Sequence, residues 1–209
     1  MVEFVFWCSL LGVLYVYGGY VIVLLSLSTI FKKRNWEVDE SHQPVVSIVM
    51  AAYNEANKIR AKLENILALD YPQGRIEVLV GSDGSTDGTN EIIREFADCG
   101  VEFICFEERG GKMRTINALV EKAQGTICVF TDVAELFDVS AIGKLVRHFV
   151  DPEIGIVAGN HIPEEGTAGV NRGTMLYRKI KRIMWNTESR LATICSVDGP
   201  IYACRRELF

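Results

Sequence analysis

The sequence predicts an α/β domain with a mostly parallel β-sheet, preceded by one long apolar helix. Three observations support this prediction. Short apolar runs alternate with segments of helical periodicity at the spacing of βαβ units. The runs are almost continuous in apolar residues, which is typical of parallel strands covered by helices on both faces. Finally, Glu3 is the only charged residue before Lys32, so apolar residues are concentrated at the start of the chain.

The composition and the charge exclude two classes of protein. The chain has 209 residues, of which 49% are hydrophobic and 23% are charged. These are the proportions of a folded protein rather than a disordered one. The formal net charge is -5, whereas a nucleic-acid-binding protein usually presents a basic face. We therefore expect no nucleic-acid partner, and the length suits one domain with an appendage.

The apolar run from Phe4 to Phe31 contains no charged residue. A helix needs roughly 20 apolar residues to cross a bilayer, whereas a cleavable signal peptide has about 7–15 and carries positive charge before them. Here the basic residues 32–34 follow the run, so the positive-inside rule places the rest of the chain in the cytosol. We expect residues 1–34 to form one uncleaved transmembrane helix with a basic flank in the plasma or inner membrane. A signal peptide cleaved near Ser26–Ser28 is the alternative.

The remaining residues, 35–209, are expected to form one cytosolic domain. Its first strand is the apolar run VVSIVM at 45–50. A helix is predicted over 59–69 because Ile59, Leu63 and Ile66 recur at helical spacing. The run IEVLV at 76–80 predicts the second strand.

The next two units continue the alternation. Thr86 or Asp87 is suited to cap a helix that runs to Cys99, and residues 101–106 form the third predicted strand. A helix over 112–123 places its apolar side chains on one face. The very apolar run at 127–131 predicts a fourth strand, which a helix over 139–150 and a fifth strand over 154–158 follow.

Polar and charged residues gather where the predicted strands end. Ligands of parallel α/β sheets bind outside the carboxyl ends of the strands. The candidate residues there are Tyr53, Glu55, Asp83, Arg109, Lys112 and Asp132. An aromatic ring can stack on a base, carboxylates can accept hydrogen bonds from a base and ribose, and a lysine at a helix start suits a diphosphate. A carboxylate such as Asp132 suits a divalent metal.

Two common nucleotide-binding motifs are absent from the sequence. The turn after the first strand has no glycine, which excludes the dinucleotide fingerprint. Gly111 and Lys112 are followed by Met113, and Phe106 stands where a P-loop needs its first glycine. A nucleotidyltransferase-like enzyme loses support for the same reason, because no glycine-rich phosphate loop follows the first strand.

The motifs together resemble those of family 2 glycosyltransferases of the GT-A fold, in their membrane-anchored form. The resemblance covers the whole predicted globular part. It depends on five blocks: VSIVMAAYNEAN at 46–57, VGSDGSTDGT at 80–89, RGGKMRTIN at 109–117, AQGTICVFTD at 123–132 and GPIYACRRELF at 199–209. The second and third blocks in register are the most specific.

The resemblance implies a role for each candidate residue. Tyr53 and Glu55 would contact the uridine of a nucleotide sugar, and Asp83 would bind the uracil or ribose. Lys112, with Arg109 near it, would stabilise the diphosphate. Asp132 matches the first acid of the family's D-x-D motif, which contacts ribose and a divalent metal, Mg²⁺ or Mn²⁺.

The activity implied is inverting transfer of a hexosyl or N-acetylhexosaminyl group from a nucleotide sugar, expected to be a UDP-sugar. Relatives of this type transfer it to a polysaccharide or lipid acceptor at the cytosolic membrane face. A metal and a lysine neutralise the leaving diphosphate, and a carboxylate base takes the proton of the acceptor hydroxyl.

Two departures from the family pattern leave alternatives open. Position 134, where D-x-D needs its second acid or amide, is Ala134, and Glu135 comes one residue late. Adjacent side chains of an extended segment point to opposite sides, which disfavours Glu135 as a substitute for the missing acid. Two alternatives stay open: Glu135 compensates for Ala134, or the metal site is weak. The family's catalytic base lies beyond the stretch that ends at Phe209, so we expect a C-terminally incomplete chain with Asp198 as the weak candidate base. A non-catalytic nucleotide-binding or scaffold subunit of the same fold is the alternative function.

The segment 172–190 combines basic and apolar residues. Arg178, Lys179, Lys181 and Arg182 are interleaved with residues such as Met175 and Trp185. An amphipathic basic helix of this kind lies on an anionic membrane surface, or packs on its own domain with the basic face in water.

Overall fold

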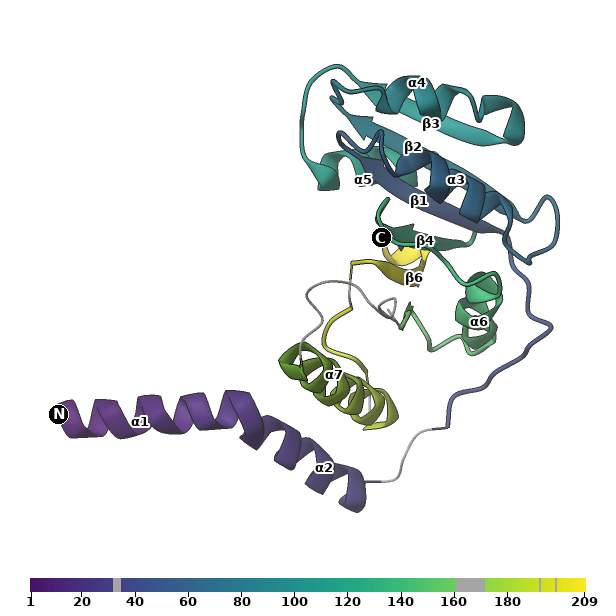
Figure 1. Ribbon diagram of the computed structural model, residues 1–209. Helices are drawn as coiled ribbons and strands as arrows, with labels where there is room; N and C mark the ends of the chain where they lie inside the picture. The colour runs from purple at the N-terminus through teal and green to yellow at the C-terminus, as the bar shows by residue number, and fades with distance from the viewer. Residues whose placement is uncertain (32–34, 161–171, 192, 198) are drawn as a thin grey trace. The chain divides into compact units, whose positions relative to one another are not determined.

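The computed structural model describes residues 1–31, 35–160, 172–191, 193–197 and 199–209. The chain divides into two units (Figure 1). One consists of Met1–Asn35 and Ile162–Ser196, and the other of Trp36–His161 and Val197–Phe209. The sequence predicted one boundary near residue 35, with all later residues in a single domain. The grouping of a second, later segment with the N-terminal residues was not expected.

The first unit is helical in its described parts. Helix α1 (Val2–Leu14), the π-helical segment η1 (Tyr15–Gly19) and helix α2 (Tyr20–Ile30) follow one another directly. Helix α7 (Arg172–Leu191) packs against α2, and the Tyr20 hydroxyl donates a 2.6 Å hydrogen bond to Oε1 of Glu188. Within the part of the chain that the structure describes, no single helix has both the length and the apolarity to span a membrane. The membrane helix expected over residues 1–34 stays a prediction.

The second unit is built on one six-stranded sheet with the order β3-β2-β1-β4-β6-β5. The strands β1 (Val46–Ala52), β2 (Ile76–Asp83), β3 (Val101–Phe106) and β4 (Ile127–Thr131) are parallel to their neighbours in this set. This confirms the parallel sheet that the apolar runs predicted.

The other edge of the sheet is antiparallel. Strand β6 (Ile201–Arg205) runs antiparallel to β4, and β5 (Ile156–Ala158) runs antiparallel to β6. The sequence had not predicted a strand over 201–205. An antiparallel strand added to an otherwise parallel sheet is common, and pairing of this kind depends on partners that a local apolar pattern does not reveal.

Helices cover both faces of the sheet. Helices α3 (Ile59–Leu67), α4 (Thr89–Arg94), α5 (Lys112–Val120) and α6 (Ala141–Val146) occupy the predicted positions but end earlier. Short 3₁₀ segments follow two of them: η2 (Ala97–Cys99) after α4 and η3 (Arg147–Val150) after α6. A further one, η4 (Arg206–Leu208), follows β6. Gly100, at φ +83°, ends η2 in the left-handed conformation that glycine adopts readily.

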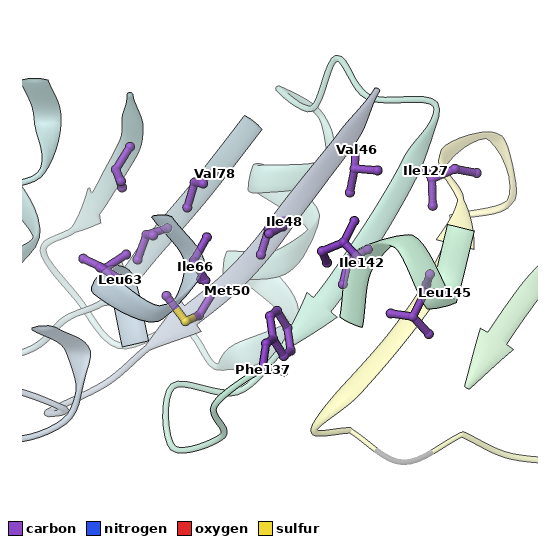
Figure 2. Packing of buried hydrophobic residues seen from close by; sticks show 14 of the residues in the cluster. Val46, Ile48, Met50, Leu63, Ile66, Val78, Ile127, Phe137, Ile142 and Leu145 are labelled. Carbon is purple, nitrogen blue, oxygen red and sulfur yellow. The ribbon is translucent and has the colours of Figure 1, made fainter. Parts of the chain in front are cut away.

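Strand β1 divides its side chains between two cores. Val46, Ile48 and Met50 are fully buried in one core with residues of α3, α4 and α6, as Figure 2 shows for α3 and α6. Val49 points into the other core, where Leu119 of α5 packs. The period-two alternation of a strand explains this division. Burial on both faces fixes the register of β1, and with it the edge at which the candidate residues leave the sheet.

Candidate functional site

The candidate donor-binding residues leave the sheet at one edge of the second unit. In the parallel register Ala52 of β1 pairs with Ser82 of β2, and Met50 pairs with Thr131 of β4. These pairs place Tyr53, which follows β1, between Asp83 of β2 and Asp132, which follows β4, at the same edge of the sheet. The sequence predicted this clustering, since the carboxyl ends of parallel strands meet at one edge.

The loops after β1 and β2 are joined by backbone-to-side-chain hydrogen bonds. The backbone N–H of Asn54 donates to Oγ of Ser85 over 3.1 Å, and the N–H of Thr86 donates to Oδ1 of Asn54 over 2.9 Å. Asn54 has φ +54°, a conformation that asparagine tolerates better than most residues. Asn54 therefore sets the direction of the chain between Tyr53 and Glu55.

A second pair of side chains fixes the same two loops. The N–H of Glu55 donates to Oγ1 of Thr89 over 2.9 Å, and the N–H of Ala56 donates to Oδ2 of Asp87 over 3.1 Å. The Thr89 hydroxyl in turn donates to Asp87, and this hydrogen bond holds the pKa of Asp87 below its usual value. These hydrogen bonds therefore fix the backbone of Glu55 at the edge of the sheet where the candidate residues lie.

Arg109 lies against Tyr53. Its guanidinium carbon is 4.1 Å from the centre of the Tyr53 ring, and the tyrosine is 38% exposed. This cation–π contact joins two predicted donor residues that come from the loops after β1 and β3. Together they form an accessible aromatic and cationic surface, which suits a stacked base.

Asp83 is almost completely buried, with 4% of its surface exposed. Its Oδ1 accepts a 2.7 Å hydrogen bond from the N–H of Gly110, and its Oδ2 accepts one of 2.8 Å from the N–H of Gly111. Gly111 has φ +94°, a conformation in which a side chain would be strained. Asp83 therefore anchors the loop that carries Arg109 and leads into Lys112. Its predicted contact with uracil or ribose stays a prediction.

Lys112 and Asp132 form an ion pair. The ammonium Nζ of Lys112, the first residue of α5, donates to Oδ1 of Asp132, and both side chains are partly exposed. The chain returns to this point after β5, because a Cβ added to Gly199 would lie 3.8 Å from Oδ2 of Asp132. Asp198, the candidate base, lies outside the described residues.

A second lysine lies behind this pair and is fully buried. Nζ of Lys62 donates a 2.9 Å hydrogen bond to Oγ1 of Thr131 and another to the backbone oxygen of Glu135. The same ammonium lies 3.6 Å from the centre of the Phe137 ring. Burial lowers the pKa of Lys62 to about 7, although the negative charges of Glu135 and Asp132 act to raise it. Lys62 ties α3 to the loop that carries Asp132.

Sequence reasoning missed Asn54, Asp87 and Lys62. A signal for Lys62 was available, because it lies three residues after Ile59 and four before Ile66, on the apolar stripe of its helix. Asn54 carried only the general tendency of such residues to form turns, and Asp87 was expected only as a cap of the helix that follows it. Their partners come from another loop, which local patterns do not show.

A comparison with protein families decides which family the chain belongs to. The model of "Glycosyl transferase family 2" matches residues 47–207, which include every candidate donor residue. The chain belongs to glycosyltransferase family 2. Its sheet and helices have the GT-A fold that the motifs implied.

Curated and solved glycosyltransferases resemble this one over different lengths. The poly-beta-1,6-N-acetyl-D-glucosamine synthase of Staphylococcus epidermidis is 32% identical over 167 residues, which cover 78% of this chain and 40% of that protein. Glycosyltransferase AglE of Haloferax volcanii is 36% identical over 91 residues, covering 43% of this chain and 30% of that protein. This glycosyltransferase chain therefore spans at most about two fifths of these curated relatives.

A solved glycosyltransferase structure is similar over most of the chain. It is the mannosyltransferase PcManGT from Pyrobaculum calidifontis, in complex with GDP-Man and Mn²⁺. The TM-score is 0.78 at 27% identity, and the similarity covers 95% of this chain and 55% of that one. That solved structure thus contains both a nucleotide sugar and a divalent metal ion.

The residues of this glycosyltransferase do not fit a divalent ion held by the protein. Ala134 offers no ligand, and one oxygen of Asp132 is bound to Lys112. The backbone of Glu135 is tied to Lys62. No group of three or more His, Cys, Asp or Glu side chains is placed to hold a metal ion in the described part of the chain. The predicted metal ligation by Asp132, with Glu135 as a possible second ligand, therefore gains no support from the geometry.

The Asn54→Ala variant is expected to weaken UDP binding and to destabilise the second unit by about 1–2 kcal/mol. It removes the acceptor for the Thr86 N–H and puts alanine at positive φ. Asn54→Gly is the matched control, because glycine loses the same hydrogen bond but tolerates the backbone conformation. Urea unfolding and UDP calorimetry compare the two variants. Equal stability of both would show that the conformation at residue 54 contributes nothing.

Proposed function

We propose that this chain carries the donor site of an inverting glycosyltransferase that uses a nucleotide sugar, with UDP as the favoured nucleotide. The observation that supports the proposal best is the role of Asp83. By anchoring the loop of Gly110 and Gly111, it presents Arg109 beside Tyr53 and Lys112 beside Asp132 at one sheet edge. A nucleoside surface and a diphosphate-binding cation thus lie on the same rigid frame.

In this proposal each group has a chemical task. Tyr53 and Arg109 hold the base by stacking, and the Glu55 carboxylate accepts hydrogen bonds from nucleoside donors. Lys112 and the N-terminus of α5 bind the diphosphate. As the acceptor hydroxyl attacks the sugar carbon, the bond from that carbon to the diphosphate breaks, and the Lys112 charge stabilises the leaving group. A carboxylate base removes the hydroxyl proton; we assign that task to no described residue.

The donor is proposed to be a UDP-hexose or UDP-N-acetylhexosamine. The name of the 32% identical relative, a synthase of an N-acetyl-D-glucosamine polymer, supports an N-acetylhexosaminyl group and a saccharide acceptor. GDP-mannose is the second candidate, because the structure with a TM-score of 0.78 is a complex with GDP-Man. The nucleotide preference is measured directly by titrating UDP and GDP separately.

We further propose that residues 1–34 anchor the protein in a membrane, where a lipid or polysaccharide acceptor meets the cytosolic face. The uncharged run from Phe4 to Phe31 and the basic residues after it support this. The exposure of the apolar side chains in this run also supports the proposal, since Phe4 is 73% exposed and Trp7 is 59% exposed. Large apolar side chains in such numbers on a helix surface indicate a lipid or protein environment rather than water.

Ala134 favours a second candidate function, a non-catalytic nucleotide-binding or scaffold subunit. The two candidates differ in turnover and not in UDP binding. Incubation of the detergent-solubilised protein with a UDP-sugar and an oligosaccharide acceptor would release UDP only in the enzyme. Binding of UDP with no release under any acceptor condition would favour the scaffold.

The Lys112→Ala variant tests the diphosphate site. We expect UDP to bind about ten- to a hundredfold more weakly, which corresponds to the loss of a charged hydrogen bond of about 1.5–3 kcal/mol. Uridine, which has no phosphate, should bind the variant and the wild type alike. Lys122→Ala is the matched control, because Lys122 is an exposed lysine just past the other end of α5. Equal losses for uridine and UDP would contradict the role of Lys112.

A further inference from the structure

We infer that Lys112 takes the place of a divalent cation at Asp132, so that the nucleoside diphosphate binds without metal. The inference rests on the proposed donor site and goes beyond it, because it concerns which cation neutralises the diphosphate. Its basis is the juxtaposition of three features: the Lys112–Asp132 ion pair, Ala134, and the buried Lys62 behind the same loop.

The oxygen atoms at the carboxyl end of β4 decide whether a metal ion can bind there. Mg²⁺ and Mn²⁺ prefer carboxylate oxygens. At this strand end Asp132 provides the carboxylate and Ala134 provides nothing. Oδ1 of Asp132 accepts a hydrogen bond from the Lys112 ammonium. A divalent ion on that oxygen would have to displace a positive charge that already neutralises it, or lie beside it against electrostatic repulsion.

Glu135 is the residue that could complete a metal site with Asp132. Its backbone oxygen accepts a hydrogen bond from Nζ of Lys62, which is fully buried. The same ammonium also donates to Thr131, the residue before Asp132. Moving the backbone of this loop would break a hydrogen bond of a buried ammonium, which is costly. Lys62 therefore holds the backbone of this loop at Thr131 and at Glu135, on both sides of Asp132 and Ala134.

Lys112 offers the diphosphate a positive charge in place of a metal ion. A lysine ammonium has three N–H donors, and one is directed to Asp132. The others are available to phosphate oxygens. The position is preset, since Lys112 is the first residue of α5 and directly follows the loop that Asp83 anchors. Asp132 orients the ammonium, the helix N-terminus adds positive potential, and the pair supplies what the metal would supply, namely a fixed cation against the diphosphate.

The experiment measures UDP affinity by calorimetry with the detergent-solubilised full chain, once with EDTA and once with saturating Mn²⁺. We expect the wild type to bind UDP in EDTA and Mn²⁺ to change the dissociation constant by less than about threefold. In Ala134→Asp, where a second acid joins Asp132 at an exposed position, Mn²⁺ should strengthen UDP binding at least about tenfold. Ala97→Asp is the matched control, since it adds the same charge at an exposed position in η2.

Lys112→Met and direct Mn²⁺ binding complete the test. Lys112→Met keeps the length of the side chain and removes the charge, so UDP binding in EDTA should fall at least about tenfold. Electron paramagnetic resonance of Mn²⁺ without nucleotide should show tighter binding to Ala134→Asp than to the wild type. Binding of UDP to the wild type only with Mn²⁺ would overturn the inference and leave the proposed function standing. Binding in neither buffer by the folded protein would overturn the proposed function itself.

Discussion

The Asp83→Ala variant is expected to bind UDP at least about a hundredfold more weakly than the wild type. The substitution leaves the N–H groups of Gly110 and Gly111 without their acceptor, and each such charge-assisted hydrogen bond contributes about 1.5–3 kcal/mol. The loop then no longer holds Arg109 and Lys112 in place. Isothermal titration calorimetry with UDP measures the loss.

Two comparisons make the Asp83 result specific. Asp83→Asn keeps one acceptor oxygen and is expected to lose less, about tenfold. Circular dichroism confirms that each variant is folded. A loss that is larger for UDP than for uridine indicates that Asp83 acts by placing Lys112, whereas equal losses indicate the direct uracil or ribose contact that the family resemblance implies. Unchanged UDP affinity in Asp83→Ala would contradict the site.

The Lys62→Met variant is expected to change how the stability of the second unit depends on pH. Burial lowers the pKa of Lys62 to about 7 in the folded protein, whereas an unfolded lysine titrates near 10.4. Between these values the unfolded chain binds more protons, so the free energy of unfolding rises with pH in the wild type. The variant lacks this contribution. The difference between them should grow by roughly 3–5 kcal/mol from pH 7 to pH 10.

Urea unfolding of both proteins at several pH values measures this difference. Taking the difference between wild type and variant removes the effects of other groups, such as Cys204, whose thiol pKa burial raises to about 11. Lys122→Met is the control, because the same change at an exposed lysine should leave the pH dependence unaltered. A difference that stays constant from pH 7 to pH 10 would show that Lys62 is not buried with a lowered pKa.

The sequence predicted the parallel half of the sheet because its strands are buried on both faces. Val46, Ile48 and Val49 are all apolar for that reason, and so is the run of β4. The same burial fixed the edge at which Tyr53, Asp83 and Asp132 emerge. For the strands that are buried on both faces, the local apolar pattern was therefore sufficient to predict the element.

The local sequence pattern did not predict the antiparallel edge of the sheet. It also did not predict the contacts that support the site. Strand β6 pairs with residues of β4 at least 70 positions earlier in the chain, such as Ile201 with Thr131. Lys62 meets Thr131 and the carbonyl of Glu135 only when α3 and the loop after β4 come together. Contacts of this kind depend on tertiary geometry, so the residue types alone indicated where chemistry lies but not what holds it in place.

The central claim is that one sheet edge of this glycosyltransferase chain binds a nucleoside diphosphate. The most direct measurement is a calorimetric titration of UDP into the detergent-solubilised full chain, with Asp83→Ala titrated in parallel. We expect saturable binding to one site in the wild type and none detectable in Asp83→Ala at the same concentrations. The absence of binding to a wild-type protein that circular dichroism shows to be folded, in EDTA and in Mn²⁺ and with UDP and GDP alike, would contradict the claim.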